Sequence, residues 1–120
     1  MTQSETADAL WMTDVGEVAI RPTSFEVAEG DITVRTLFSG ISRGTERTVL
    51  AGRVPASEHD VMRAPFQEGA FSFPLKYGYA AVGEIEGGAH AGEVVFSLFP
   101  HQTRFAVPGD MVHPLSLIHI

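Results

Sequence analysis

Glycine and proline recur along the whole chain, and this recurrence is the feature that most constrains the fold. The 120 residues include 12 glycines and 7 prolines, which divide the sequence into short segments. Glycine loses the most backbone entropy on ordering and proline has no backbone N–H, so both mark turns and breaks. Intervals of about ten residues between such breaks are typical of short strands in a small β-barrel or sandwich.

Apolar and polar residues alternate between these breaks as they do in half-buried strands. Residues 9–13 and 17–21 flank turn residues 14–16, which predicts a hairpin, and residues 22–30 read as a connector. The next strand, 31–39, places Ile32, Val34 and Phe38 on one face. Further strands are predicted at 76–86, 94–98 and 103–107, and short helices at 47–50 and 57–63, the latter with Ser57 as its N-cap.

Composition excludes several classes of function. The chain has no cysteine, so disulfides, iron–sulfur clusters and cysteine-ligated zinc are ruled out. Its formal net charge of -7 argues against binding to nucleic acid, whose affinity comes largely from Lys and Arg. No apolar run approaches the roughly 20 residues of a membrane span. Residues 1–8 lack a secretory signal and are expected to be disordered, and the expected compartment is the cytoplasm.

Four segments, in this order, resemble the medium-chain dehydrogenase/reductase superfamily. They are Ser39–Glu46 (SGISRGTE), Phe73–Gly83 (FPLKYGYAAVG), Gly92–Phe96 (GEVVF) and Phe105–Pro108 (FAVP). The branch that they most resemble is the zinc-type alcohol dehydrogenases, and bacteriochlorophyllide dehydrogenases carry similar segments. Members begin with a GroES-like β-barrel catalytic domain and continue into a Rossmann domain that binds NAD(P).

The resemblance implies a mainly β fold, a GroES-like small barrel with short helices over residues 9–114, with the Rossmann domain missing. The whole protein would then be an NAD(P)-dependent oxidoreductase acting on a small-molecule alcohol or carbonyl, and the 120-residue chain alone would be inactive. Neither nucleic acid nor membrane is expected as a partner, and a homo-oligomeric whole protein stays open.

The zinc ligands of the family are not matched in this sequence. Ser42 or Arg43 stands where zinc-dependent members have a cysteine, and Tyr79 and Ala80 replace their His and Glu. Hydroxyl groups are poor ligands for Zn²⁺ compared with thiolate and imidazole. We therefore expect no catalytic zinc. The remaining histidines are scattered without metal-site spacing: His59, His90 and His113.

Other groups would then have to stabilise the negative charge that hydride transfer develops on a carbonyl oxygen. The catalytic candidates are Tyr79 as first choice of donor, Arg43 as an anion-binding group and His101 as a proton relay. Each candidate also has a structural alternative. Tyr79 could be a half-buried aromatic and Arg43 a surface arginine paired with Glu46, while His101 could be a surface corner residue. Thr45 and Glu46 are expected to fix the polar elbow that follows the strand 31–39 through local hydrogen bonds. The residues expected to line the cleft are Ser42, Thr45, Glu46 and Gln102.

The sequence shows no nucleotide-binding motif, because Gly83, Gly87 and Gly88 are followed by strand-like residues rather than by a helix. We therefore expect a truncated chain. Residues 115–120 (LSLIHI) resemble the translation of a transposon-end adapter used in DNA library preparation, which predicts a non-native tail; a natural apolar strand is the alternative.

Two other classes of function remain open at this point. One is a non-catalytic binding module on the same barrel, since a fold does not fix a function. The other is a structural subunit like the co-chaperonin that gives the fold its name, although the mobile apolar loop expected there is not evident.

Overall fold

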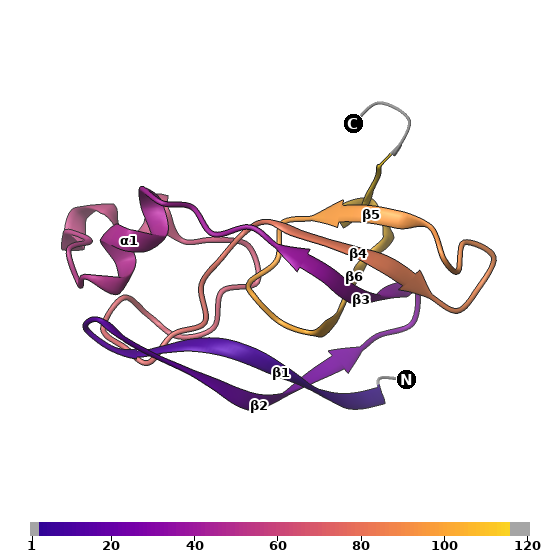
Figure 1. The fold of residues 1–120 in the computed structure, drawn as a ribbon, viewed down its shortest axis with the longest axis horizontal. Coiled ribbons are helices and arrows are strands. Elements are labelled where there is room, and N and C mark those ends of the chain that lie inside the picture. Colours follow the sequence, from indigo (N-terminus) through magenta and orange to yellow (C-terminus); the bar gives the residue numbers. More distant parts are fainter. Residues whose placement is uncertain (1–2, 116–120) are drawn as a thin grey trace.

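The strands form two sheets that lie one against the other (Figure 1). The structure is a computed structural model that describes residues 3–115. The strands β1 (Gln3–Asp14) and β2 (Glu17–Val27) make a two-stranded hairpin. The second sheet has five antiparallel strands in the order β6-β3-β4-β5-β7. Their bounds are β3 Asp31–Ser39, β4 Ala81–Glu86, β5 Val94–Ser97, β6 Arg104–Pro108 and β7 His113–Pro114.

The mainly β architecture with short helices is confirmed, but the two sheets do not close into a barrel within residues 3–115. The β pairing between the hairpin and the rest of the described chain consists of two isolated bridges, from Ala9 to Gln102 and from Met12 to Leu75. These bridges hold the hairpin over the segments that carry the candidate site residues.

The hairpin is longer than the sequence analysis predicts. Its turn at residues 14–16 is as expected, with the Val15 N–H donating to the Asp14 carboxylate at 2.8 Å. The expected disorder at residues 1–8 and the expected connector at 22–30 both differ from the structure, because residues 3–8 pair with residues 22–27. Pro22 is compatible with this pairing, since a two-stranded ribbon has only edge strands.

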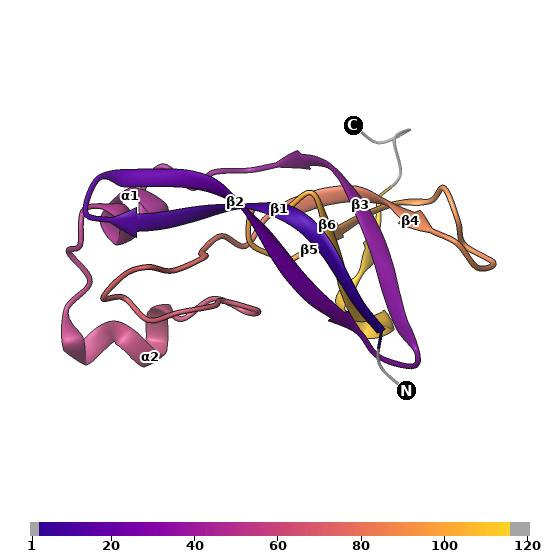
Figure 2. The ribbon, with the colours of Figure 1, turned by 90° about the horizontal axis from the view of Figure 1, so that it is seen from below.

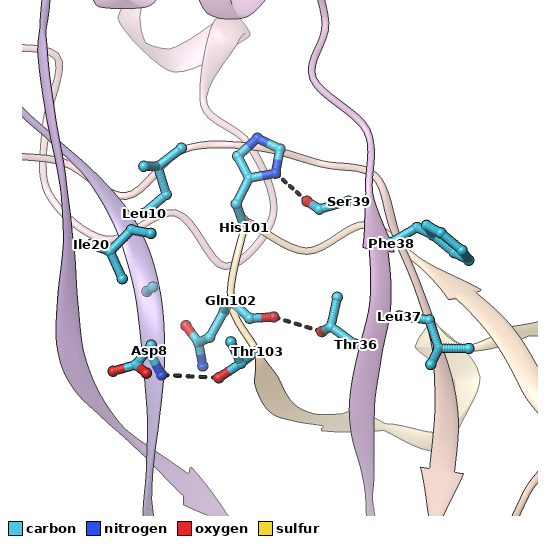
Figure 3. Close-up of a pocket in the computed structure, with 11 residues that line it drawn as sticks. Asp8, Leu10, Ile20, Thr36, Leu37, Phe38, Ser39, His101, Gln102 and Thr103 are labelled. Carbon is cyan, nitrogen blue, oxygen red and sulfur yellow. Dashed lines mark hydrogen bonds between the residues drawn. The ribbon is translucent and has the colours of Figure 1, made fainter.

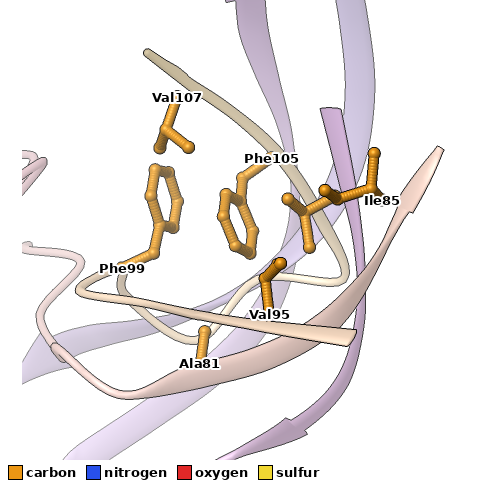
Figure 4. Packing of buried hydrophobic residues seen from close by; sticks show 7 residues of the cluster. Ala81, Ile85, Val95, Phe99, Phe105 and Val107 are labelled. Atoms are coloured by element: carbon orange, nitrogen blue, oxygen red, sulfur yellow. The ribbon is translucent and has the colours of Figure 1, made fainter. Parts of the chain in front are cut away.

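Strand β3 has the predicted bounds and supplies part of the main core. Val34 is fully buried in a cluster that we call the sheet cluster (Figure 4), made of Val34, Ala81, Ile85, Val95, Phe99, Phe105 and Val107. Phe38 does not share this face, as it is 73% exposed. The pairing of β3 with β4 shifts register between Thr36 and Phe38, and such a bulge redirects the side chains that follow it.

The helices gather at one end of the molecule, beside the turn of the hairpin (Figure 2). They are α1 (Thr45–Leu50), α2 (His59–Met62) and a short 3-10 helix at Ala56–Glu58. Another 3-10 helix, Gly109–Met111, lies apart from them, between β6 and β7. Ser57 does not act as an N-cap, because it lies inside its short helix, after Pro55. A second core, the helix cluster, consists of Met12, Val49, Ala64, Leu75 and Tyr77. No helix in residues 3–115 is long and apolar enough to cross a membrane.

Candidate functional site

The elbow after β3 is fixed by hydrogen bonds between neighbouring side chains and backbone. The Gly40 N–H donates to the Ala80 carbonyl at 2.9 Å as the strand ends. The Ser42 N–H donates to Glu46 Oε2 at 2.5 Å, and the Thr45 N–H donates to Ser42 Oγ at 3.2 Å. Glu46 thus holds the elbow through its side chain, as predicted, whereas Thr45 does so through its backbone.

His101 lies on the corner between β5 and β6, where the hairpin holds it in place. The Leu10 N–H donates to the His101 carbonyl at 2.9 Å, and the Thr103 N–H donates to the Asp8 carbonyl at 2.8 Å. His101 is only 7% exposed, so it is not the surface corner residue of the alternative interpretation. Its ring packs against Gly78, where an added Cβ would lie 2.8 Å from Nε2.

Ser39, His101 and Glu46 form one chain of hydrogen bonds. The imidazole Nε2 contacts Glu46 Oε1, and Nδ1 contacts the Ser39 hydroxyl, as Figure 3 shows for the second pair. A carboxylate only accepts, so Nε2 carries a proton, and in the neutral ring Nδ1 is then the acceptor for the Ser39 O–H. The order carboxylate, imidazole, hydroxyl is the order that activates a hydroxyl group for proton transfer.

Two hollows adjoin this chain, one at each end. The first, which we call the Ser39 cavity, has a volume of about 320 Å³ and is lined by Asp8, Ala9, Leu10, Ile20, Thr36, Leu37, Phe38, Ser39, His101, Gln102 and Thr103. In Figure 3, Leu10 and Ile20 lie on one side of His101, and Leu37 and Phe38 on the other. The second, the Arg43 cavity, has about 410 Å³ and is lined by Leu10, Met12, Val18, Ile41, Ser42, Arg43, Glu46, Arg47 and Leu50.

Most of the predicted site residues line one of the two cavities, whereas Thr45 and Tyr79 line neither. Ser42, Arg43 and Glu46 line the Arg43 cavity, while His101 and Gln102 line the Ser39 cavity. Tyr79 lines neither of these two cavities. Its ring packs edge-on against Tyr77, with centroids 6.3 Å apart, at the margin of the helix cluster.

The side chain of Gln102 accepts a hydrogen bond from a buried lysine, Lys76, which was not predicted from the sequence. Lys76 is 1% exposed, and its ammonium group contacts Gln102 Oε1 and lies 2.5 Å from Glu68 Oε2. Because its amide oxygen is engaged by Lys76, Gln102 positions Lys76 and the strand corner. No pattern in the sequence pointed to this contact, since lysine is almost never fully buried unless it is paired.

Tyr77 is the buried phenol next to the site. Its hydroxyl donates to the Met62 carbonyl at 2.7 Å. Burial raises the pKa of Tyr77 above its usual value, and the neighbouring Tyr79 and Glu46 raise it further. The phenol therefore stays protonated at neutral pH and acts as a hydrogen-bond donor to the backbone.

Neither the glycine-rich turn of a dinucleotide site nor a cluster of metal ligands is found among residues 3–115. Gly83 lies inside β4 and Gly87 in the turn that leads to β5, so no strand-turn-helix follows these glycines in residues 3–115. The same part of the chain holds no group of three or more His, Asp or Glu side chains placed around a metal ion.

No model of a known protein family matches the chain, and no curated protein matches its sequence. Solved structures do match. The human synaptic vesicle membrane protein VAT-1 homolog-like protein aligns with a TM-score of 0.67 at 14% identity, over 94% of this chain and 36% of that one. A probable oxidoreductase from Mycobacterium abscessus aligns with a TM-score of 0.63 at 11% identity, over 92% and 34%.

The quinone oxidoreductase from Thermus thermophilus, whose structure was also solved with NADPH, aligns with a TM-score of 0.58 at 19% identity, over 92% of this chain and 32% of that one. The chain spans about a third of the length of each of these proteins. At identities this low the likeness concerns the fold. The chain therefore shares its fold with about a third of two named oxidoreductases and of a VAT-1-like protein.

Proposed function

We propose that this chain forms the substrate-side domain of an NAD(P)-dependent oxidoreductase that acts on an alcohol/carbonyl pair without catalytic zinc. The shared fold supports this proposal, because two of the three matched structures are named as oxidoreductases and one was solved with NADPH. A quinone, the substrate class in the name of one of them, belongs to the same carbonyl class.

The observation that carries the proposal is the chain of Ser39, His101 and Glu46 at the edge of a largely apolar cavity. Carbonyl reduction needs a hydrogen-bond donor at the substrate oxygen, and a hydroxyl backed by imidazole and carboxylate meets that need without a metal. Arg43, at the adjoining cavity, is suited to an anionic group of substrate or cofactor.

The described residues do not fit the cofactor by themselves, so NAD(P) would be held by another part of a longer protein. This domain would bind the substrate, orient its oxygen and exclude water.

The test compares the 120-residue chain with a longer product of the same gene. We expect the chain alone to leave NADPH fluorescence unchanged, and the longer product to bind NADPH and oxidise it with a quinone or ketone. NADPH binding by the chain alone would contradict the proposal that another part of a longer protein holds the cofactor. A longer product that binds the ketone but never oxidises NADPH would favour the non-catalytic binding module instead.

A further inference from the structure

Ser39 has two hydrogen-bond neighbours besides any ligand. Its hydroxyl contacts His101 Nδ1 and lies 3.4 Å from the Ala80 carbonyl. When the ring is neutral, Ser39 donates to Nδ1. When the ring carries both protons, Nδ1–H donates to Ser39 Oγ, and the hydroxyl hydrogen turns to another acceptor, either the Ala80 carbonyl or a ligand. The direction of this hydroxyl therefore reports the protonation of the ring.

On its far side the ring faces a buried carboxylate. Glu46 is 3% exposed, its Oε1 faces Nε2 of His101, and its Oε2 accepts from the Ser42 N–H at 2.5 Å. A carboxylate held in this way keeps the proton on Nε2. Any additional proton on the ring must therefore reside on Nδ1, which faces Ser39.

The other charged groups nearby are engaged or stand at the cavity walls. In the segment before β4, Lys76 forms a salt bridge with Glu68 and a hydrogen bond with Gln102. From the hairpin, Asp8 lines the Ser39 cavity, and from the elbow and α1, Arg43 and Arg47 line the other cavity. Tyr77 lies close enough to Glu46 for the carboxylate to raise its pKa, and its phenol is neutral. Glu46 and Ser39 are thus the groups that the ring itself contacts through its nitrogens.

The hydrogen bond that a ligand oxygen can form with Ser39 depends on the protonation of the ring. A carbonyl oxygen only accepts, so it needs the Ser39 hydrogen, and that hydrogen is released when Nδ1 is protonated. An alcohol can donate to Ser39 Oγ while Ser39 donates to a neutral ring. We propose that the Ser39 cavity binds the carbonyl member of the substrate pair with uptake of one proton by His101, and the alcohol member without it. This inference rests on the proposed function for the substrate class, while its chemistry involves no nicotinamide.

Coupled proton uptake has a quantitative consequence. Where His101 is neutral in the free chain, carbonyl affinity falls about tenfold for each unit rise in pH, whereas alcohol affinity stays flat. Removing the Ser39 hydroxyl costs about threefold to tenfold in carbonyl affinity, the range of one hydrogen bond.

The experiment uses the 120-residue chain with acetophenone and 1-phenylethanol, which have the same carbon skeleton. Titrations followed by NMR give both affinities as a function of pH, and ¹⁵N shifts of His101 report which ring nitrogens are protonated. Calorimetry in two buffers of different ionisation enthalpy counts protons taken up. We expect close to one proton for the ketone and none for the alcohol.

Variants test whether Ser39 and His101 are responsible for the pH dependence of ketone binding. Ser39→Ala and His101→Gln abolish the pH dependence of ketone binding, Ser39→Thr retains it, and Ser24→Ala on the exposed face of the hairpin changes nothing. Equal proton uptake with both ligands, no binding of either, or ketone binding that is indifferent to Ser39→Ala would each overturn the inference. Failure of the longer protein to oxidise NADPH would sink the proposed function but would leave these binding results unchanged.

Discussion

Position 78 sets the space that the imidazole of His101 can occupy. Gly78 has φ of +155°, which side-chain-bearing residues rarely adopt, and an added Cβ would lie 2.8 Å from His101 Nε2. The ring cannot step aside cheaply, because it is buried and bonded on both nitrogens. The glycine is therefore part of the site although it contributes no functional group.

Gly78→Ala is expected to destabilise the chain by about 1–3 kcal/mol and to break the contact between His101 and Glu46, through backbone strain and displacement of the ring. Urea unfolding gives the first quantity, and the NMR signals of the His101 ring report the second. Gly44→Ala is the matched control, since Gly44 has φ of -79° and open space at its Cβ. A Gly78→Ala chain of unchanged stability with the contact intact would contradict this account.

At the residue scale the sequence predicted some members of the site and not others. Glu46, Ser42 and His101 stand at the breaks between strands, where polar residues signal a function, and the structure places them around the two cavities. Ser39 escaped notice because its partner lies 62 residues away and the pairing depends on the register of β3. Tyr79 was the first choice of donor from the sequence, but in the structure its ring packs edge-on against Tyr77.

Among the elements, β6 is tied to both sheets by a single side chain. Arg104 donates to Glu86 of β4 at 2.9 Å and to Glu5 of β1 at 2.6 Å, and its guanidinium lies 5.6 Å from the ring centroid of Phe25. Hydrogen bonds to Glu86 and Glu5 raise the pKa of Arg104 above its usual value. This arginine is therefore the ionic contact that holds the N-terminal half of the hairpin against the five-stranded sheet.

Arg104→Met is expected to lower the free energy of unfolding by about 1–2 kcal/mol, because the charge-assisted hydrogen bonds to the two carboxylates Glu86 and Glu5 are lost while the apolar stem is kept. Urea unfolding at low and high NaCl measures the cost and its screening. Arg35→Met is the control: its pair with Glu84 is 51% and 37% exposed, so the cost should stay below about 1 kcal/mol. Equal losses for both variants would show that Arg104 has no special role.

Element boundaries were predictable where local chemistry decides them. Strand β3 and the turn at residues 14–16 follow from alternation and turn residues. The extension of the hairpin to Gln3 was not predictable, because it depends on pairing across the ribbon and on Arg104, which is 99 residues from Glu5. The strand expected to begin at residue 76 starts only at Ala81, because the preceding segment instead pairs with Met12 and Glu68.

For the molecule as a whole, the apolar core is divided into the sheet cluster and the helix cluster. The first lies within the five-stranded sheet and the second between the hairpin and α1. This division could not be predicted from the sequence, because it follows from the way the hairpin lies over the loops.

Val49→Ala and Val107→Ala, one in each cluster, are each expected to cost about 2 kcal/mol, and in combination their costs should add within about 0.5 kcal/mol. Both side chains are almost fully buried, at 1% and 0% exposure. Val95→Ala combined with Val107→Ala, within the sheet cluster, should deviate more from additivity. A double-mutant cycle by urea unfolding checks this, and strong coupling between Val49 and Val107 would mean that the two clusters pack as one core.

The contact between Glu46 and His101 joins positions that are 55 residues apart in the sequence. The same carboxylate anchors the Ser42 amide on one side, and the same imidazole faces Ser39 on the other. The elbow and the corner consequently respond as one mechanical unit. We therefore expect a molecule that displaces the imidazole from one hollow to loosen the backbone that borders the other.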